Sequence, residues 1–146
     1  MKIAIINGPN VNMIGTREPE VYGNESFESY FAQLDQDFPD IEFVYFQSNV
    51  EGELINFMHS LHKNGDARGV LLNAGGYTHT SVALADTVAA ISIPCVEIHI
   101  SNVFKRETFR HTSYIGSACI GSISGFGLES YRLGVQYFLN AQKTSK

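Results

Sequence analysis

Short apolar runs alternate along the chain with longer segments whose apolar residues recur at helical spacing. Each run is bounded by polar residues, glycine or proline. A continuous apolar run of this length is typical of a strand that is covered on both faces. The pattern predicts five strands, the first three of them interior, at residues 3–6, 41–46, 69–72, 95–100 and 118–123.

The segments between the runs carry helical signals. After Ser26, which can cap a helix, Phe27, Phe31, Leu34 and Phe38 follow at steps of four, three and four, so they share one face of a helix. Helices are predicted at residues 27–38, 50–61, 80–91 and 127–140. Strands that alternate with helices predict an α/β fold, a doubly wound five-stranded parallel sheet with helices on both faces. Such sheets bind ligands at the carboxyl ends of their strands, where the strand order reverses.

The first strand is followed by an unusually long polar segment, residues 7–23, with the sequence NGPNVNMIGTREPEVYG. Most strand-to-helix connections have about 2 to 6 residues, and longer loops in compact domains are usually binding loops or lids. This one carries Arg17 and Tyr22 between Gly15 and Gly23, which could serve as hinges. We therefore expect a mobile lid that brings catalytic side chains with it.

Length and composition narrow the class of protein. A chain of 146 residues predicts one domain, spanning 1–146. No apolar run approaches the roughly 20 residues of a membrane span, and the start of the chain lacks a secretory apolar region. A cytoplasmic protein without membrane contact is expected.

Charge argues against a nucleic-acid partner, because the net charge is −5 and the basic residues are scattered. Three arginines, Arg17, Arg106 and Arg110, lie in predicted loops, where they could hold a small anion. Arg106 could equally be a solvated surface charge.

The fourth strand places Glu97, His99 and Ser101 on one face, because their positions differ by two. Burying a carboxylate or an imidazole without a partner costs several kcal/mol. Pairing is therefore expected, with Glu97 orienting His99 and favouring its protonated form. His99 becomes a candidate general acid. The alternative is a structural ion pair beneath a loop.

The stretch NAGGYTHTS, residues 73–81, places a turn, hydroxyls and His79 at a helix start, where backbone amides favour anions or hydroxyl-rich ligands. Thr80 or Ser81 could instead be simple helix caps. Neither a dinucleotide nor a nucleoside triphosphate fingerprint is present.

Metal and thiol chemistry are not expected. His59 and His62 lie three apart on a predicted helix, but no carboxylate completes a site with them. Cys95 and Cys119 lie in apolar runs without a CxxC spacing, so we expect buried small side chains rather than a disulfide or a nucleophile.

Tyr22 is a candidate base. A free phenol has a pKa near 10, and a nearby guanidinium can lower such a pKa by roughly 1 to 3 units. Arg17, five positions upstream, could supply that guanidinium. The alternative is an exposed tyrosine stacked on loop residues.

Taken together, these motifs resemble type II 3-dehydroquinate dehydratase over nearly the whole chain. The resemblance rests on six segments in the family's order: NGPNVN (7–12), GTREPEVYG (15–23), FQSNVEGELI (46–55), NAGGYTHTS (73–81), VEIHISN (96–102) and FRHTSY (109–114). It implies a flavodoxin-like fold and a cofactor-free anti elimination of water from 3-dehydroquinate through an enolate, giving 3-dehydroshikimate.

The resemblance also implies catalytic roles. Tyr22 would remove the proton next to the ketone, with Arg17 lowering the pKa of its phenol. Asn10 would hold a water that stabilises the enolate oxygen. His99 would protonate the departing hydroxyl, oriented by Glu97.

Substrate binding and assembly are implied in the same way. Asn73 and the backbone amides of Ile100 and Ser101 would hold the substrate carboxylate and ring, and His79 and Arg110 the ring hydroxyls. In the family, subunits form trimers that assemble into a dodecamer, and Asp86 of a neighbouring subunit would reach the site.

The chain departs from the family in one loop that matters. Ala74 and Gly76 stand where the family commonly has Pro and Ala, and a looser turn after the third strand is expected.

The lysines lie at element ends, in loops or in the tail, which disfavours a Schiff-base route. The alternative from another class is a non-catalytic module that binds a flavin or a small anion.

Overall fold

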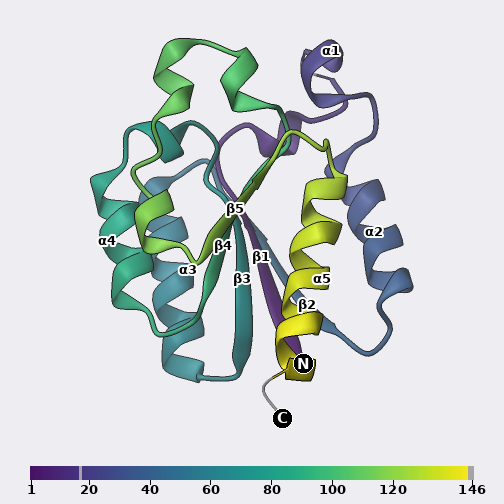
Figure 1. Cartoon of the computed structure of the whole chain (residues 1–146), viewed down its shortest axis with the longest axis vertical. Coiled ribbons are helices and arrows are strands. Elements are labelled where there is room, and N and C mark those ends of the chain that lie inside the picture. Colours follow the sequence, from purple (N-terminus) through teal and green to yellow (C-terminus); the bar gives the residue numbers. More distant parts are fainter. Residues whose placement is uncertain (17, 145–146) are drawn as a thin grey trace.

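Five parallel strands form one sheet in the computed structural model, which describes residues 1–16 and 18–144 (Figure 1). The strand order is β2-β1-β3-β4-β5. This confirms the predicted α/β fold and the parallel sheet. The strands are β1 (Lys2–Asn7), β2 (Glu42–Gln47), β3 (Ala67–Asn73), β4 (Cys95–His99) and β5 (Gly121–Ser124).

Helices cover both faces of the sheet, with α2 and α5 on one side and α3 and α4 on the other (Figure 1). Successive side chains of a strand point to opposite faces, so Ile3 and Ile5 pack in the α2–α5 layer while Ala4 and Ile6 pack in the α3–α4 layer. The helices are α1 (Pro19–Tyr22), α2 (Phe27–Asp37), α3 (Glu51–Asn64), α4 (Val82–Ala90) and α5 (Glu129–Thr144).

Helix starts follow the capping expected from the sequence. The Ser26 hydroxyl accepts a hydrogen bond from the Ser29 amide at 3.1 Å, and α2 begins at the next residue. Ser81 caps α4 by accepting from the Leu84 amide at 2.9 Å. The cap interpretation of Ser81 is therefore confirmed, and α4 begins two residues later than predicted.

The strand order reverses beside β1, which lies between β2 and β3. Asn7 ends β1 and Asn73 ends β3, and the two residues are register partners. The loops that leave β1 and β3 therefore start side by side, as the rule for doubly wound sheets requires. Both lead to the end of the sheet where the short helix α1 and residues 101–118 lie (Figure 1).

The prediction that residues 41–46 form an interior strand is wrong. β2 is an edge strand paired with β1 alone, and its side chains after Glu42 are half-buried. Its apolar run reflects the helices on both faces: the Tyr45 ring stacks on Phe31 of α2, and the Phe46 ring stacks on Phe57 of α3 at 4.4 Å.

The fifth strand is shorter than predicted. β5 begins at Gly121, because residues Gly116–Ala118 form a 3₁₀ turn instead of extended chain. Among the described strands, β5 pairs with β4. Residues 101–114 are irregular as expected, with two short 3₁₀ segments, Val103–Lys105 and Thr108–His111.

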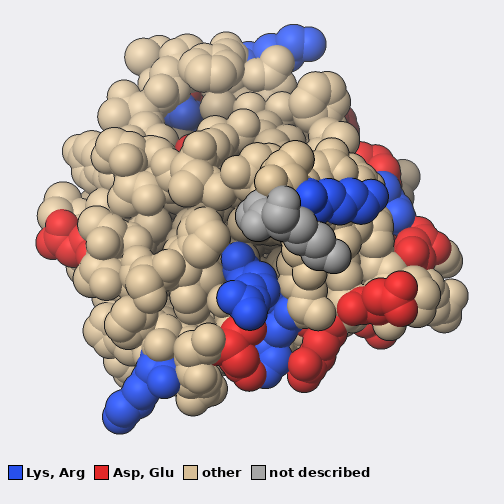
Figure 2. All heavy atoms as spheres, turned by 60° about the horizontal axis from the view of Figure 1, so that its bottom comes forward, with Lys and Arg blue, Asp and Glu red and all other residues tan. Residues whose placement is uncertain are grey.

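Acidic and basic side chains are mixed on the face that Figure 2 shows, at the end of the sheet opposite to α1. At the start of β1, the Lys2 ammonium lies 2.5 Å from the Asp66 carboxylate and 3.9 Å from that of Glu42, the first residue of β2. Among the described residues, no helix is both long and apolar enough to cross a membrane.

Candidate active site

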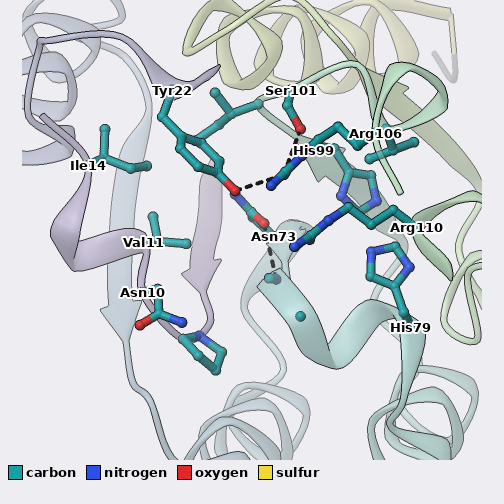
Figure 3. Close-up of a pocket in the computed structure, with 15 residues that line it drawn as sticks. Asn10, Val11, Ile14, Tyr22, Asn73, His79, His99, Ser101, Arg106 and Arg110 are labelled. Carbon is teal, nitrogen blue, oxygen red and sulfur yellow. Dashed lines mark hydrogen bonds between the residues drawn. The ribbon is translucent and has the colours of Figure 1, made fainter. Parts of the chain in front are cut away.

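A cleft of about 120 Å³ opens at the carboxyl ends of β1, β3 and β4. Figure 3 shows side chains from the loop after β1, the turn after β3 and the segment after β4 pointing toward one another. Eight of the residues predicted for the site line this cleft: Asn10, Tyr22, Asn73, His79, His99, Ile100, Ser101 and Arg110.

The phenol of Tyr22 points into the cleft and meets a guanidinium there (Figure 3). Arg106 Nη1 donates a hydrogen bond to the Tyr22 oxygen at 2.7 Å and another to Ser101 Oγ at 3.2 Å. The same guanidinium lies 5.2 Å from the centre of the Tyr22 ring. The sequence named Arg106 only as a possible anion ligand or surface charge, whereas its side chain is largely buried against Tyr22.

Arg17, which was expected to activate Tyr22, lies outside the described residues. The long segment that carries both residues contains two short helical turns, Val11–Met13 and Pro19–Tyr22. Gly15 and Gly23, the expected hinges, adopt φ values of 100° and 85°, a region that favours glycine. The lid function of the segment stays a prediction.

The carboxylate of Glu97 pairs with His99, as the spacing predicted. Glu97 Oε2 lies 3.0 Å from His99 Nε2, and the Ser113 hydroxyl donates to the same carboxylate oxygen. Burial alone would raise the pKa of Glu97, but hydrogen bonds from His99 and Ser113 and the attraction of His99 lower it below the usual value. Because His99 lines the cleft, the pair is not sealed beneath a loop.

His79 lies beside His99, with the two ring centres 6.2 Å apart and the planes nearly parallel. The Thr112 carbonyl lies 2.6 Å from His79 Nδ1, so Nδ1 carries the proton and donates it. Burial lowers the pKa of His79, and the nearby His99 and Arg110 charges lower it further. His79 therefore enters the cleft as a neutral imidazole whose Nε2 is an acceptor.

Asn10 lines the cleft from a left-handed turn with φ 70°. Its backbone amide donates to Asn49 Oδ1 at 3.0 Å, and Gln47 Nε2 donates to the Gly8 carbonyl and to Asn49 Oδ1 at 3.2 Å each. Asparagine tolerates this conformation better than most residues. Side chains at and just after the end of β2 thus hold the Asn10 turn in place.

The loops after β1 and β3 are packed backbone against backbone. A Cβ atom on Gly8 would lie 2.4 Å from the Ala74 carbonyl oxygen, and one on Gly75 would lie 2.9 Å from the Pro9 carbonyl oxygen. The Gly8 amide donates to the Asn73 carbonyl at 2.7 Å. Ala74 has φ −74°, close to the value that proline fixes, so the turn keeps a proline-compatible shape without the ring. The expected looseness of this turn stays a prediction.

Two predicted residues do not line the cleft of their own chain. Glu97 lies behind His99, where it acts on the imidazole. Asp86 is exposed on α4 and is absent from the described lining residues.

The thiols and the remaining histidines play no part in the cleft. Burial raises the pKa of both Cys95 and Cys119 to about 12, so neither thiol is a nucleophile, and both are free. His62 Nδ1 accepts a hydrogen bond from the Ser92 amide at 3.2 Å. Within residues 1–16 and 18–144, no three His, Cys, Asp or Glu side chains gather in a group able to hold a metal ion.

The cleft thus combines a phenol held by a guanidinium with an imidazole held by a carboxylate. A phenolate at Tyr22 could accept a proton, and a protonated His99 could donate one. Acid–base catalysis requires these two functions. Fold and site together define an α/β enzyme of the proton-transfer type.

Comparison with known proteins identifies the family. Residues 1–139 match the family Dehydroquinase class II, and the chain belongs to it. A 3-dehydroquinate dehydratase of Exiguobacterium sp. is 52% identical over 136 residues, covering 92% of each chain. The type II dehydroquinase of Butyrivibrio crossotus superposes with a TM-score of 0.91 at 41% identity, covering 94% of this chain and 97% of that one. That of Propionibacterium acnes gives a TM-score of 0.87 at 31% identity, covering 93% and 94%.

Proposed function

We propose that this chain dehydrates 3-dehydroquinate to 3-dehydroshikimate, the activity named for its relatives. The observation that carries the proposal is the meeting of Tyr22 and His99 in one cleft, each with the partner its role requires. The alternative of a flavin-binding module has no such support, because it would need neither a base nor an acid.

In the proposed reaction, the Tyr22 phenolate removes the proton next to the ketone, and the electrons of that C–H bond form the enolate. As the ketone re-forms, the C–O bond to the hydroxyl breaks, and His99 gives its proton to the departing oxygen to make water. The base and the acid act on opposite faces of the ring, which makes the elimination anti. Asn10 would hold the water that stabilises the enolate oxygen.

Arg106 supplies the positive charge beside the base. An N–H donor aimed at the phenol oxygen stabilises negative charge there, and the 2.7 Å contact of Arg106 meets this condition. Arg17 stays a predicted second contributor from the same family resemblance. Glu97 holds His99 and balances its positive charge.

Substrate binding is assigned to the polar rim of the cleft. Asn73 and the backbone amides of Ile100 and Ser101 would hold the carboxylate and ring, while His79 and Arg110 would bind the ring hydroxyls. Among the described residues that line the cleft, no lysine is present, which supports a route without an imine. The absence of a cofactor stays a prediction.

A homo-oligomer is part of the proposal, in the form of a dodecamer assembled from trimers. Asp86 would then approach the cleft of a neighbouring subunit from α4. Asp86 is exposed, and Val82 on the same helix exposes 61% of its surface, as expected of residues covered only in an assembly. Light scattering tests the mass. The cytoplasmic location and the single catalytic domain stay predictions.

Formation of the conjugated enone product tests the activity, since it raises ultraviolet absorbance without added metal or nucleotide. Tyr22→Phe should nearly abolish turnover while substrate binding stays measurable. Tyr137→Phe is the matched control, because Tyr137 is an exposed tyrosine on α5 outside the cleft. This variant should retain full activity. Full activity of Tyr22→Phe would exclude Tyr22 as the base.

Treatment of the enzyme with borohydride in the presence of substrate tests the route. Inactivation with a covalent adduct would show an imine and refute the proposed route.

A further inference from the structure

A buried tyrosine behind the cleft links the ends of two strands. Tyr131 of α5 is fully buried, and its hydroxyl donates to Asn7 Oδ1 at 2.7 Å and accepts from Asn73 Nδ2 at 2.9 Å. Asn7 and Asn73 are the last residues of β1 and β3 and lie opposite each other in the sheet. Tyr131 itself does not line the cleft, whereas Asn73 does.

The direction of these hydrogen bonds decides how Asn73 is oriented. A tyrosine hydroxyl has one proton, and Tyr131 gives it to Asn7. Asn73 can therefore approach the hydroxyl only with its NH₂ group. On the other side, the Gly75 amide donates to Asn73 Oδ1 at 3.2 Å (Figure 3). Flipping the amide would place its NH₂ against another donor and its oxygen against a hydroxyl whose proton is already used.

The Tyr131 hydroxyl is also held in place by the packing of its ring and by the position of its acceptor, Asn7. The Tyr131 ring packs edge-on against Phe27 at 5.0 Å, within the apolar layer between the sheet and α2 and α5. Asn7 Nδ2 also reaches the Tyr45 oxygen at 3.4 Å. Because burial raises the pKa of Tyr131 above its ordinary value, the hydroxyl keeps its proton throughout the neutral range.

We propose that Tyr131 is a positioning residue for substrate binding: through its single proton it selects the amide orientation that Asn73 presents to the substrate. This inference rests on the proposed function, in which Asn73 binds the substrate carboxylate and ring. Tyr131 touches no reacting atom. Its loss should therefore weaken binding and leave the chemical step almost unchanged.

Tyr131→Phe removes the hydroxyl and keeps the ring. The expected result is a rise of about tenfold in KM with kcat within about threefold of the wild type, because one hydrogen bond to a charged group is misdirected. Tyr30→Phe is the matched control. Its ring lies 6.4 Å from that of Tyr131 in the same layer, and its hydroxyl takes no part in the hydrogen bonds that join Tyr131 to Asn7 and Asn73. Tyr30→Phe should change neither constant by more than about twofold.

A double variant separates positioning from general loss of stability. Asn73→Ala should raise KM on its own, and adding Tyr131→Phe to it should raise KM no further, because the group that Tyr131 positions is gone. Additive effects would overturn the inference. So would a Tyr131→Phe variant that melts at a lower temperature but keeps the wild-type KM, or one in which kcat falls and KM does not change.

A second variant covers the case in which Tyr131→Phe does not fold. Asn7→Ala keeps the tyrosine but removes the acceptor of its proton, so the hydroxyl no longer dictates the orientation of Asn73, and KM should rise again. An unchanged KM overturns the inference. A wild-type enzyme that forms no enone would instead refute the proposed function, so the two failures are distinguishable.

Discussion

The contact between Arg106 and Tyr22 predicts a large loss of rate when the guanidinium is removed. Arg106 is largely buried, and its Nη1 lies 2.7 Å from the phenol oxygen. At an effective dielectric constant of about 20, unit charges at that separation would attract by about 6 kcal/mol, which is an upper bound. Measured hydrogen bonds to charged groups contribute about 1.5–3 kcal/mol, and this lower figure is the better guide.

Arg106→Gln should therefore lower kcat by roughly 10- to 150-fold. Arg106→Lys should fall between Gln and the wild type, because a lysine keeps the charge but cannot donate to Tyr22 and Ser101 in the fixed geometry of a guanidinium. The assay is the rise in enone absorbance at saturating 3-dehydroquinate near neutral pH. Arg132→Gln is the control, since Arg132 pairs with Asp37 at 2.7 Å away from the cleft.

Two results would refute this reasoning. A kcat of Arg106→Gln within about twofold of the wild type would mean that the phenol does not need this guanidinium. A higher KM with unchanged kcat would assign Arg106 to the substrate instead of the base, since uniform binding energy alters KM alone.

Three further predictions concern the site and the sheet. Glu97→Gln should lower kcat by roughly tenfold or more, because a carboxylate stabilises imidazolium and an amide does not. The pKa of Glu97 is lowered by folding, so its contribution to stability is present above the unfolded value of about 4.5 and is lost as the pH falls through the folded value. The melting temperatures of wild type and Glu97→Gln should therefore converge in acid; a constant difference would contradict this. Ala74→Pro should raise the melting temperature, with a gain of about 0.4–1 kcal/mol, because φ is already −74°; a lower one would mean that the ring does not fit. Gly69→Ala should destabilise by about 1–3 kcal/mol in urea unfolding, because its Cβ would lie 2.5 Å from the Phe138 ring; an unchanged midpoint would show that Phe138 moves aside.

Much of the fold and of the candidate site could be predicted from the order of the apolar runs and of the polar residues that end them. One predicted strand ends in Asn73, and another carries Glu97 and His99 two positions apart. In a parallel sheet, these groups therefore lie at the same end of the sheet, where the strands have their carboxyl ends, whatever the strand order. The order itself is set by which helix covers which face, and periodicity does not encode it. For this reason β2 was expected inside the sheet but lies at its edge.

The partners of the predicted residues were harder to find. Arg106 lies in an irregular segment whose path depends on tertiary contacts, such as the hydrogen bond from the Tyr114 amide to the Thr78 carbonyl at 2.8 Å. Tyr131 lies in the helix predicted at residues 127–140, but the spacing of apolar residues gave it no role beyond packing. A tyrosine on the buried stripe of a helix needs a hydrogen-bond partner, and the asparagines that end two apolar strands offered one. That signal was present in the sequence.

The close packing of Gly8 on Ala74 and of Gly75 on Pro9 limits how this cleft can diversify. An insertion or a larger side chain in either loop would displace the other, so the two loops must vary as a unit. Their shared position beside Asn73 means that any such variation also moves the anchoring amide. Altered substrate preference is therefore more accessible through residues 101–114, which border the same opening without this mutual constraint, and a mutagenesis library aimed at new ring substituents should start there.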